Sequence, residues 1–165
     1  MRELAFVALL ALAACSDEAD PAKEADAAPA QQLQAGQWEI TSEVVAFNQA
    51  DQGAPKIDTP VGTKETTTHC VPQADVKRPE PALFAATGDS CNYRDVYMSG
   101  GRINASIDCT RNGLRGQLMY SVNGSYTATS IDATRDLQTY LTSDGDVGVS
   151  SKITGRHVGQ CTSGS

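Results

Sequence analysis

Short stretches in which apolar and polar residues alternate recur between Gly36 and Ser165, and each predicts a β-strand. The clearest is 38–44, Trp-Glu-Ile-Thr-Ser-Glu-Val, where large apolar side chains occupy alternate positions. Further strands are predicted at 62–69, 91–98, 102–109, 114–122, 125–132, 137–142 and 147–154. The stretch 62–69 is β-prone but polar, which favours an edge strand or a strand with a thin buried face.

Turn residues separate these strands at short intervals. Ser99-Gly100-Gly101, Asn123-Gly124 and Asp144-Gly145 contain residues that tolerate positive φ, and Asn-Gly is among the strongest short hairpin signals. The stretch with helical character, 72–86, is interrupted by prolines, so any helix there is short. The pattern predicts a mainly β domain over 36–165, an antiparallel meander that forms a sandwich or a curved, partly closed sheet.

The N-terminal residues follow a different pattern, an apolar run from Leu4 through Ala14 that begins just after Arg2. This run is far shorter than the roughly 20 apolar residues needed to cross a bilayer. It has the length of the hydrophobic part of an export signal, so we predict a signal peptide over 1–14.

The run ends in Leu12-Ala13-Ala14-Cys15, which resembles the lipobox of bacterial lipoproteins. The resemblance implies cleavage before Cys15 and attachment of lipid, palmitate included, to that cysteine. In such proteins an aspartate after the cysteine usually retains the protein in the inner membrane. The residue here is Ser16, which implies the outer membrane and its periplasmic face.

A compositional change follows Cys15. Residues 15–35 are rich in alanine, proline and glutamine and hold five acidic residues against the single Lys23. A segment of this kind buries too little apolar surface to offset its chain entropy. We therefore predict a disordered acidic tether between lipid and domain, with a reach on the order of 25 Å.

The net charge of the whole chain is −7, and residues 36–165 hold 11 basic and 14 acidic residues. Nucleic-acid binding depends on clustered lysine and arginine that neutralise phosphates, so an acidic domain argues against DNA or RNA as a partner. The same balance gives no electrostatic attraction to anionic lipid. Membrane contact is expected through the N-terminal lipid alone.

Four cysteines remain after Cys15, and an even number in an exported domain points to two disulfides with three possible connectivities. Folding the chain about Gly100 places Cys91 opposite Cys109, close enough for a disulfide between paired strands. A strict two-residue turn would shift this register by one residue, so the pairing requires a longer loop or a bulge.

In the same register Tyr93 faces Ile107 and Tyr97 faces Ile103, which makes one face of the hairpin apolar. Cys70 and Cys161 then pair by elimination. That bond closes a long loop and, in the chain-entropy model, contributes on the order of 4 kcal/mol.

Other site chemistry is weakly represented. His69 and His157 lie near Cys70 and Cys161, which raises a metal site as the competing interpretation, but no close metal-ligand spacing occurs. The sequence has no Gly-x-Ser-x-Gly motif and no glycine-rich phosphate loop. We expect no catalytic residue, no metal and no cofactor.

The landmarks together resemble a known family. They are Gly36-Gln37-Trp38-Glu39-Ile40, Thr68-His69-Cys70-Val71-Pro72, Cys91, Cys109, Tyr120-Ser121-Val122-Asn123-Gly124-Ser125-Tyr126 and Gly159-Gln160-Cys161. This order is similar to that in the proteobacterial family catalogued as domain of unknown function 3617, which includes many lipoproteins and secreted proteins. The resemblance covers the domain and implies no catalytic residues.

The eight aromatic residues of the domain suggest a thin core, and we expect them to fill the inner face of the sheet. Alternatively Trp38, Tyr93, Tyr97 and Tyr120 line a ligand pocket in an incompletely closed barrel. We expect a non-catalytic envelope binding or interaction module. The alternatives are a carrier of a lipid-like or other small apolar ligand and, with least support, an enzyme.

Overall fold

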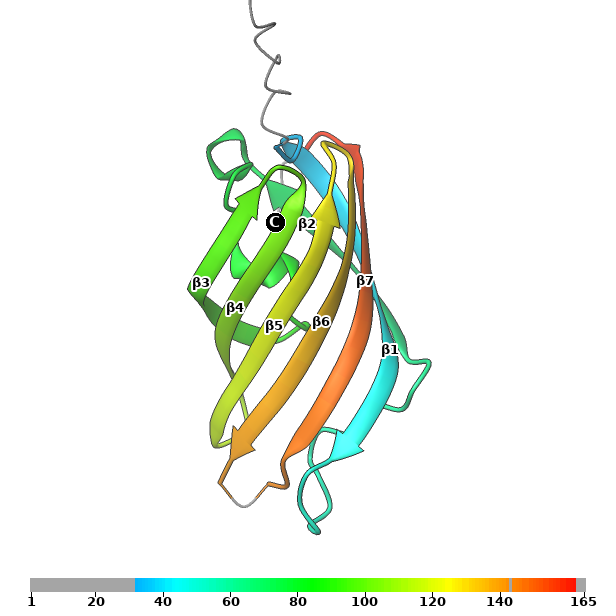
Figure 1. The fold of residues 1–165 in the computed structure, drawn as a ribbon, viewed down its shortest axis with the longest axis vertical. Coiled ribbons are helices and arrows are strands. Elements are labelled where there is room, and N and C mark those ends of the chain that lie inside the picture. Colours follow the sequence, from blue (N-terminus) through cyan, green and yellow to red (C-terminus); the bar gives the residue numbers. More distant parts are fainter. Residues whose placement is uncertain (1–31, 143, 163–165) are drawn as a thin grey trace, which may run out of the picture.

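The computed structural model describes residues 32–142 and 144–162, which form one antiparallel seven-stranded sheet (Figure 1). The strands are β1 (Gly36–Gln49), β2 (Lys64–Val71), β3 (Asp89–Ser99), β4 (Arg102–Arg111), β5 (Gly116–Tyr126), β6 (Ser130–Leu141) and β7 (Val147–Gly159). Two 3-10 turns, η1 (Gln73–Asp75) and η2 (Pro81–Leu83), lie between β2 and β3. The predicted signal peptide, Cys15 and most of the predicted tether lie outside the described residues.

The strand order is β2-β1-β7-β6-β5-β4-β3, so β3 to β7 form a meander and the β1–β2 hairpin joins it at β7. The sheet is strongly curled (Figure 1), which confirms the curved, partly closed alternative over the sandwich. The polar strand β2 is an edge strand, as its sequence predicted. The other edge is β3.

Residues 72–88 connect the two edge strands across the concave face. Prolines prevent a continuous helix here, because a proline inside a helix removes a backbone donor and clashes with the preceding turn. In place of one short helix the segment forms η1 and η2, with Pro81 at the start of η2. Its apolar side chains Val76, Leu83 and Phe84 are buried against the sheet.

The alternation seen in the sequence determines which side chains enter the core. In β1 the buried positions are Gly36, Trp38, Ile40, Ser42 and Val44, and the residues between them are more exposed. The indole of Trp38 is fully buried, and its Nε1 donates a hydrogen bond to Gln34 O at 2.9 Å.

Packing begins before β1. Leu33, in the predicted tether, is only 2% exposed, and its backbone N–H donates to Val76 O. The backbone N–H of Gln34 likewise donates to Ala128 O. The segment just before Gly36 is therefore part of the folded domain.

The prediction of a turn at Asn123-Gly124 is wrong, because both residues lie inside β5. At Gly124 an added Cβ would lie 2.3 Å from Asp132 O and 2.6 Å from Ala133 Cβ on β6. The glycine therefore permits a close approach of two strands. The chain turns instead at 127–129. Residues 125–126 therefore complete β5, and the rest of the strands predicted at 125–132 and 137–142 lies in one strand, β6.

In the β3–β4 hairpin, the residue pairs far from the turn are those that the sequence predicted. Cys91 pairs with Cys109 and Tyr93 pairs with Ile107. The turn contains only Gly100 and Gly101, both with positive φ. The register is restored by a bulge between Tyr93 and Asp95, the type of irregularity that the cysteine pairing required.

The bulge also corrects one predicted contact. Beyond it Tyr97 pairs with Asn104 and Met98 pairs with Ile103, so the expected Tyr97–Ile103 pair is wrong. A one-residue shift turns every following side chain to the other face of a strand. Tyr97 is accordingly 57% exposed, and Val96 and Met98 pack against the core.

Candidate functional site

The four aromatic residues proposed as a ligand site do not come together. Trp38 is fully buried in the core, and Tyr93 donates its hydroxyl hydrogen to Pro79 O at 2.9 Å. Tyr97 faces away from the core. Tyr120 alone of the four lines a cavity on the concave face.

Both predicted disulfides are present, with Cα–Cα distances of 5.4 Å for Cys70–Cys161 and 4.1 Å for Cys91–Cys109. Among the described residues, the two histidines do not form a group of possible metal ligands with these cysteines. His69 and His157 pair with Trp38 from the strands on either side of β1. His69 and Cys70 are consecutive in β2, so their side chains point to opposite faces of the sheet.

Within the described residues, one group of metal-ligand types gathers within 4.8 Å, namely Asp89, Cys91 and Cys109. Metal coordination by cysteine requires the thiolate, and both sulfurs here belong to a disulfide. The group therefore offers a single carboxylate.

The concave face contains a cavity of about 190 Å³. Its walls come from β1, β2, β4, β5, β6 and β7, from the loop 50–63 and from the end of the crossing segment 72–88. The large apolar side chains of the wall are Val44, Ile57, Leu137 and Val149. The polar part includes Ser42, Glu65, Arg111, Tyr120, Arg135 and Ser151.

Arg135 is the most unusual residue of this wall. It occupies an inward position of β6 and is only 8% exposed. Its Nη1 donates to Phe84 O at 3.2 Å, its Nη2 donates to Ser42 Oγ at 2.9 Å, and its Cζ lies 5.5 Å from the centre of the Tyr120 ring. Burial lowers the pKa of the guanidinium, and nearby Tyr120, Glu65 and Asp89 partly offset this effect.

Among the described residues, no carboxylate oxygen lies within 4.0 Å of the Arg135 guanidinium. The nearest hydrogen-bond partners are a carbonyl and a hydroxyl, which are neutral. A buried charge without a counter-ion is costly, because neither water nor an opposite charge fully stabilises it.

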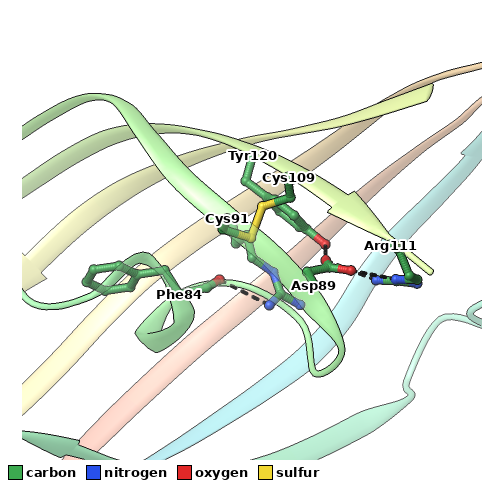
Figure 2. Close-up of a disulfide and its surroundings, with 7 residues drawn as sticks. Phe84, Asp89, Cys91, Cys109, Arg111 and Tyr120 are labelled. Atoms are coloured by element: carbon green, nitrogen blue, oxygen red, sulfur yellow. Dashed lines mark hydrogen bonds and ion pairs between the residues drawn. A yellow bond between two sulfur atoms is a disulfide. The ribbon is translucent and has the colours of Figure 1, made fainter. Parts of the chain in front are cut away.

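Asp89 is near enough to Arg135 to raise its pKa, but its carboxylate is bound by Arg111 and Tyr120 (Figure 2). Arg111 donates from Nε to Asp89 Oδ1 at 2.6 Å and from Nη2 to Oδ2 at 3.1 Å, while the Tyr120 hydroxyl donates to Oδ2. The Asp89 side chain has no exposed surface. Its charge is thus shared by Arg111 and Tyr120 beside the Cys91–Cys109 disulfide.

Tyr120 is held in its neutral form. Burial raises the pKa of its phenol well above the ordinary value, and the negative charge of Asp89 and the hydrogen bond to it raise the pKa further. Both oxygens of the Asp89 carboxylate already accept hydrogen bonds from Arg111 and Tyr120. These two groups therefore bind and orient better than they transfer protons.

Arg135 is not among the residues predicted from the sequence, although a signal for it is present in β6. Ile131, Ala133, Leu137 and Thr139 alternate on one side of β6, and Arg135 stands between them as the charged inward residue. Dividing this strand into two at 132 and 137 concealed that pattern.

No helix among the described residues is long and apolar enough to cross a bilayer. The chain has no match among curated proteins and none among solved structures. The family model described as "Protein of unknown function (DUF3617)" matches residues 33–161, from Leu33 to the last cysteine. This range includes the whole sheet, both disulfides and the cavity, and the chain therefore belongs to the DUF3617 family of proteins of unknown function.

Proposed function

We propose that this protein is a non-catalytic binding module of the bacterial envelope that holds a small ligand in its concave cavity. The observation that carries the proposal is the buried Arg135 guanidinium, which lines a cavity of about 190 Å³ and has no carboxylate partner among the described residues. A concave, mostly preformed site with a few convergent polar groups is typical of small-molecule binding.

The cavity wall is fastened to the rest of the fold. Ile57, in a loop without regular structure, is only 6% exposed. Next to it, Lys56 forms an ion pair with Asp144 at 2.6 Å, and its backbone N–H donates to Asp144 O. The Lys56 hydrogen bond also lowers the pKa of Asp144, so this ion pair persists at neutral pH. A wall fixed in this way reduces the ordering cost of binding.

Binding is favoured over catalysis by the state of the polar groups. A nucleophile needs an adjacent base, and a general base needs a free lone pair near its substrate. Here Tyr120 remains protonated and Asp89 is ion-paired with Arg111. A guanidinium and hydroxyls facing a partly apolar cavity provide recognition.

We also propose that the module is exported and held by lipid on Cys15 at the periplasmic face of the outer membrane. Support comes from the apolar run, the Leu12-Ala13-Ala14-Cys15 sequence and Ser16. A Cys15→Ser change should release the protein from the membrane fraction. An unlipidated N-terminal peptide in the native protein, with unchanged fractionation, would contradict this assignment.

The binding proposal is tested by filling the cavity. Ser151 is 1% exposed on an inward position of β7, so Ser151→Leu places a larger side chain in the cavity. Thr154→Leu makes a comparable change on the exposed face of the same strand. Small molecules released from the wild type and both variants, purified from native membranes, are compared by mass spectrometry.

We expect a small molecule to accompany the wild type and Thr154→Leu and to be lost from Ser151→Leu. Near-ultraviolet circular dichroism establishes that each variant is folded. The same molecules in all three folded proteins would show that nothing is held in this cavity, and the proposal would then be wrong.

A further inference from the structure

We infer that the ligand of this cavity is a small organic carboxylate whose charged group binds Arg135 and whose apolar part lies against Val44, Ile57, Leu137 and Val149. The inference rests on the proposed function and specifies the chemical class of the ligand. The charge of the ligand follows from the free donors of Arg135, and its size and apolar part follow from the volume and the apolar side chains of the cavity.

The charge of the ligand follows from the partners of Arg135. A guanidinium has five N–H donors, two on each terminal nitrogen and one on Nε. One N–H of Nη1 bonds to Phe84 O, and one N–H of Nη2 bonds to Ser42 Oγ. Donors therefore remain for a further acceptor on the cavity side. An anion placed there pairs with a cation whose only close protein partners are neutral, and a carboxylate can accept two parallel hydrogen bonds.

A single negative charge fits the wall better than a double one. Glu65 lines the same cavity, and the Asp89 carboxylate lies behind Tyr120 and Arg111. Arg111 is already ion-paired with Asp89, which leaves Arg135 as the cation of this wall without a carboxylate within ion-pair distance among the described residues. A phosphate dianion would bring a second negative charge into the same partly desolvated cavity as the Glu65 carboxylate.

The cavity also limits the size of the ligand. Its volume of about 190 Å³ exceeds the roughly 150 Å³ of an apolar cavity known to hold benzene. The space therefore suits a benzene-sized body with a carboxylate attached. The four large apolar side chains can contact the apolar part of the ligand, and Arg135 with the polar residues around it can bind the carboxylate.

Benzoate and benzamide provide a matched pair of probes, because they share size and shape and differ in charge. Isothermal titration calorimetry of the full domain with each probe tests the inference directly. The wild type should bind benzoate at least about tenfold more tightly than benzamide, since a hydrogen bond to a charged group contributes more than a neutral one. This comparison needs no variant and so does not depend on the folding of one.

Variants then locate the effect. Arg135→Gln should weaken benzoate binding about tenfold or more and leave benzamide binding nearly unchanged. Arg102→Gln removes the same charge from an exposed position of β4 and should change neither affinity. Arg135→Lys retains the charge without the planar fork and should fall between the wild type and Arg135→Gln.

The outcomes separate this inference from the proposed function. If benzamide binds as well as benzoate, or phenyl phosphate binds more tightly than both, the carboxylate assignment is overturned. If folded Arg135→Gln binds benzoate like the wild type while Ser151→Leu binds neither probe, the cavity binds ligands but Arg135 does not recognise them. Benzoate binding that survives in Ser151→Leu would overturn both proposals.

Discussion

The two halves of the concave face are built differently. Near the start of β1, Trp38 of the sheet and Phe84 of the crossing segment 72–88 fill the space between these two layers, and both are fully buried. Packing there is so dense that a Cβ at Gly155 would lie 2.8 Å from Ile40 Cδ1. In the other half the same sheet surrounds a cavity of about 190 Å³ with hydroxyls and a buried cation.

Because of this difference, stability and ligand binding depend on different halves of the same sheet. Dense apolar packing supplies most of the favourable energy of a small domain, and a cavity gives up part of it. A buried cation without a carboxylate is a further cost. Folded proteins tolerate such costs where function requires them, so the filled half should determine stability and the hollow half recognition.

The largest expected effect concerns the disulfide of the filled half. Cys70–Cys161 closes a separation of 91 residues, whereas Cys91–Cys109 closes 18. In the chain-entropy model, removing the longer link by Cys70→Ala with Cys161→Ala lowers the free energy of unfolding by about 4 to 5 kcal/mol. Removing the shorter link should cost about 3 kcal/mol.

Urea unfolding of the two paired variants measures this difference. If Cys91→Ala with Cys109→Ala were the more destabilised pair, the hollow half would depend on its cross-link more than the filled half does. That result would reverse the comparison.

The next effect tests packing. Trp38→Ala removes a fully buried indole together with its hydrogen bond to Gln34 O. Loss of a buried tryptophan typically costs about 3 to 5 kcal/mol. Trp38 is the single tryptophan of the chain, so far-ultraviolet circular dichroism should follow the urea unfolding in place of fluorescence. Trp38→Phe, which keeps an aromatic ring, should lose less than half as much. A loss below about 1 kcal/mol for Trp38→Ala would show that this half is not the stabilising one.

A smaller effect is expected in the hollow half. Arg135→Met removes a buried cation that has only neutral hydrogen-bond partners, while a side chain of similar length retains the packing. The gain from removing the charge should nearly offset the lost hydrogen bonds, so stability should change by about 1 kcal/mol or less. Thermal and urea unfolding measure it. A loss as large as that of Trp38→Ala would mean that Arg135 is a structural residue.

The smallest effect is a pH dependence at His69. Burial lowers the pKa of His69 from the ordinary 6.5, and Glu80 partly offsets the shift. The unfolded chain therefore takes up the proton more readily, and the stabilising contribution of neutral His69 is lost as pH falls below about 6.5. In His69→Gln the group does not titrate, so the stability difference between wild type and variant should shift against the wild type from about pH 8 to pH 5. A constant difference over that range would contradict the assignment.

The sequence predicted those parts of the fold that depend on local pattern. Alternation identified the strands around Trp38 and the polar edge β2, and counting from Gly100 gave the Cys91–Cys109 pair. The apolar positions of a strand and the distance between cysteines in a hairpin are properties of consecutive residues, which is why they could be predicted.

The errors arose where a distant neighbour determines the local structure. Gly124 looks like a turn residue, but its role depends on how closely β6 approaches it. The bulge before Asp95 has no local signature, and it alone moves Tyr97 to the outer face. The cavity is formed by six of the strands together with the loop 50–63 and the end of the segment 72–88, so no single stretch of sequence could indicate it.

The pairing of β1 with β7 has a consequence for the time course of folding. Gln37 pairs with Gly159, so one of the first strands to leave the ribosome finds its partner only when almost the whole domain is present. Contacts between residues so far apart form slowly, because the entropy of closing the intervening chain is lost first; such topologies fold on the order of milliseconds to seconds. The β3–β7 meander, made of neighbouring hairpins, should therefore assemble before the β1–β2 hairpin adds to it. Until then the apolar side chains of β1, Trp38 among them, lack their packing partners and are the part of the newly made chain most exposed to aggregation.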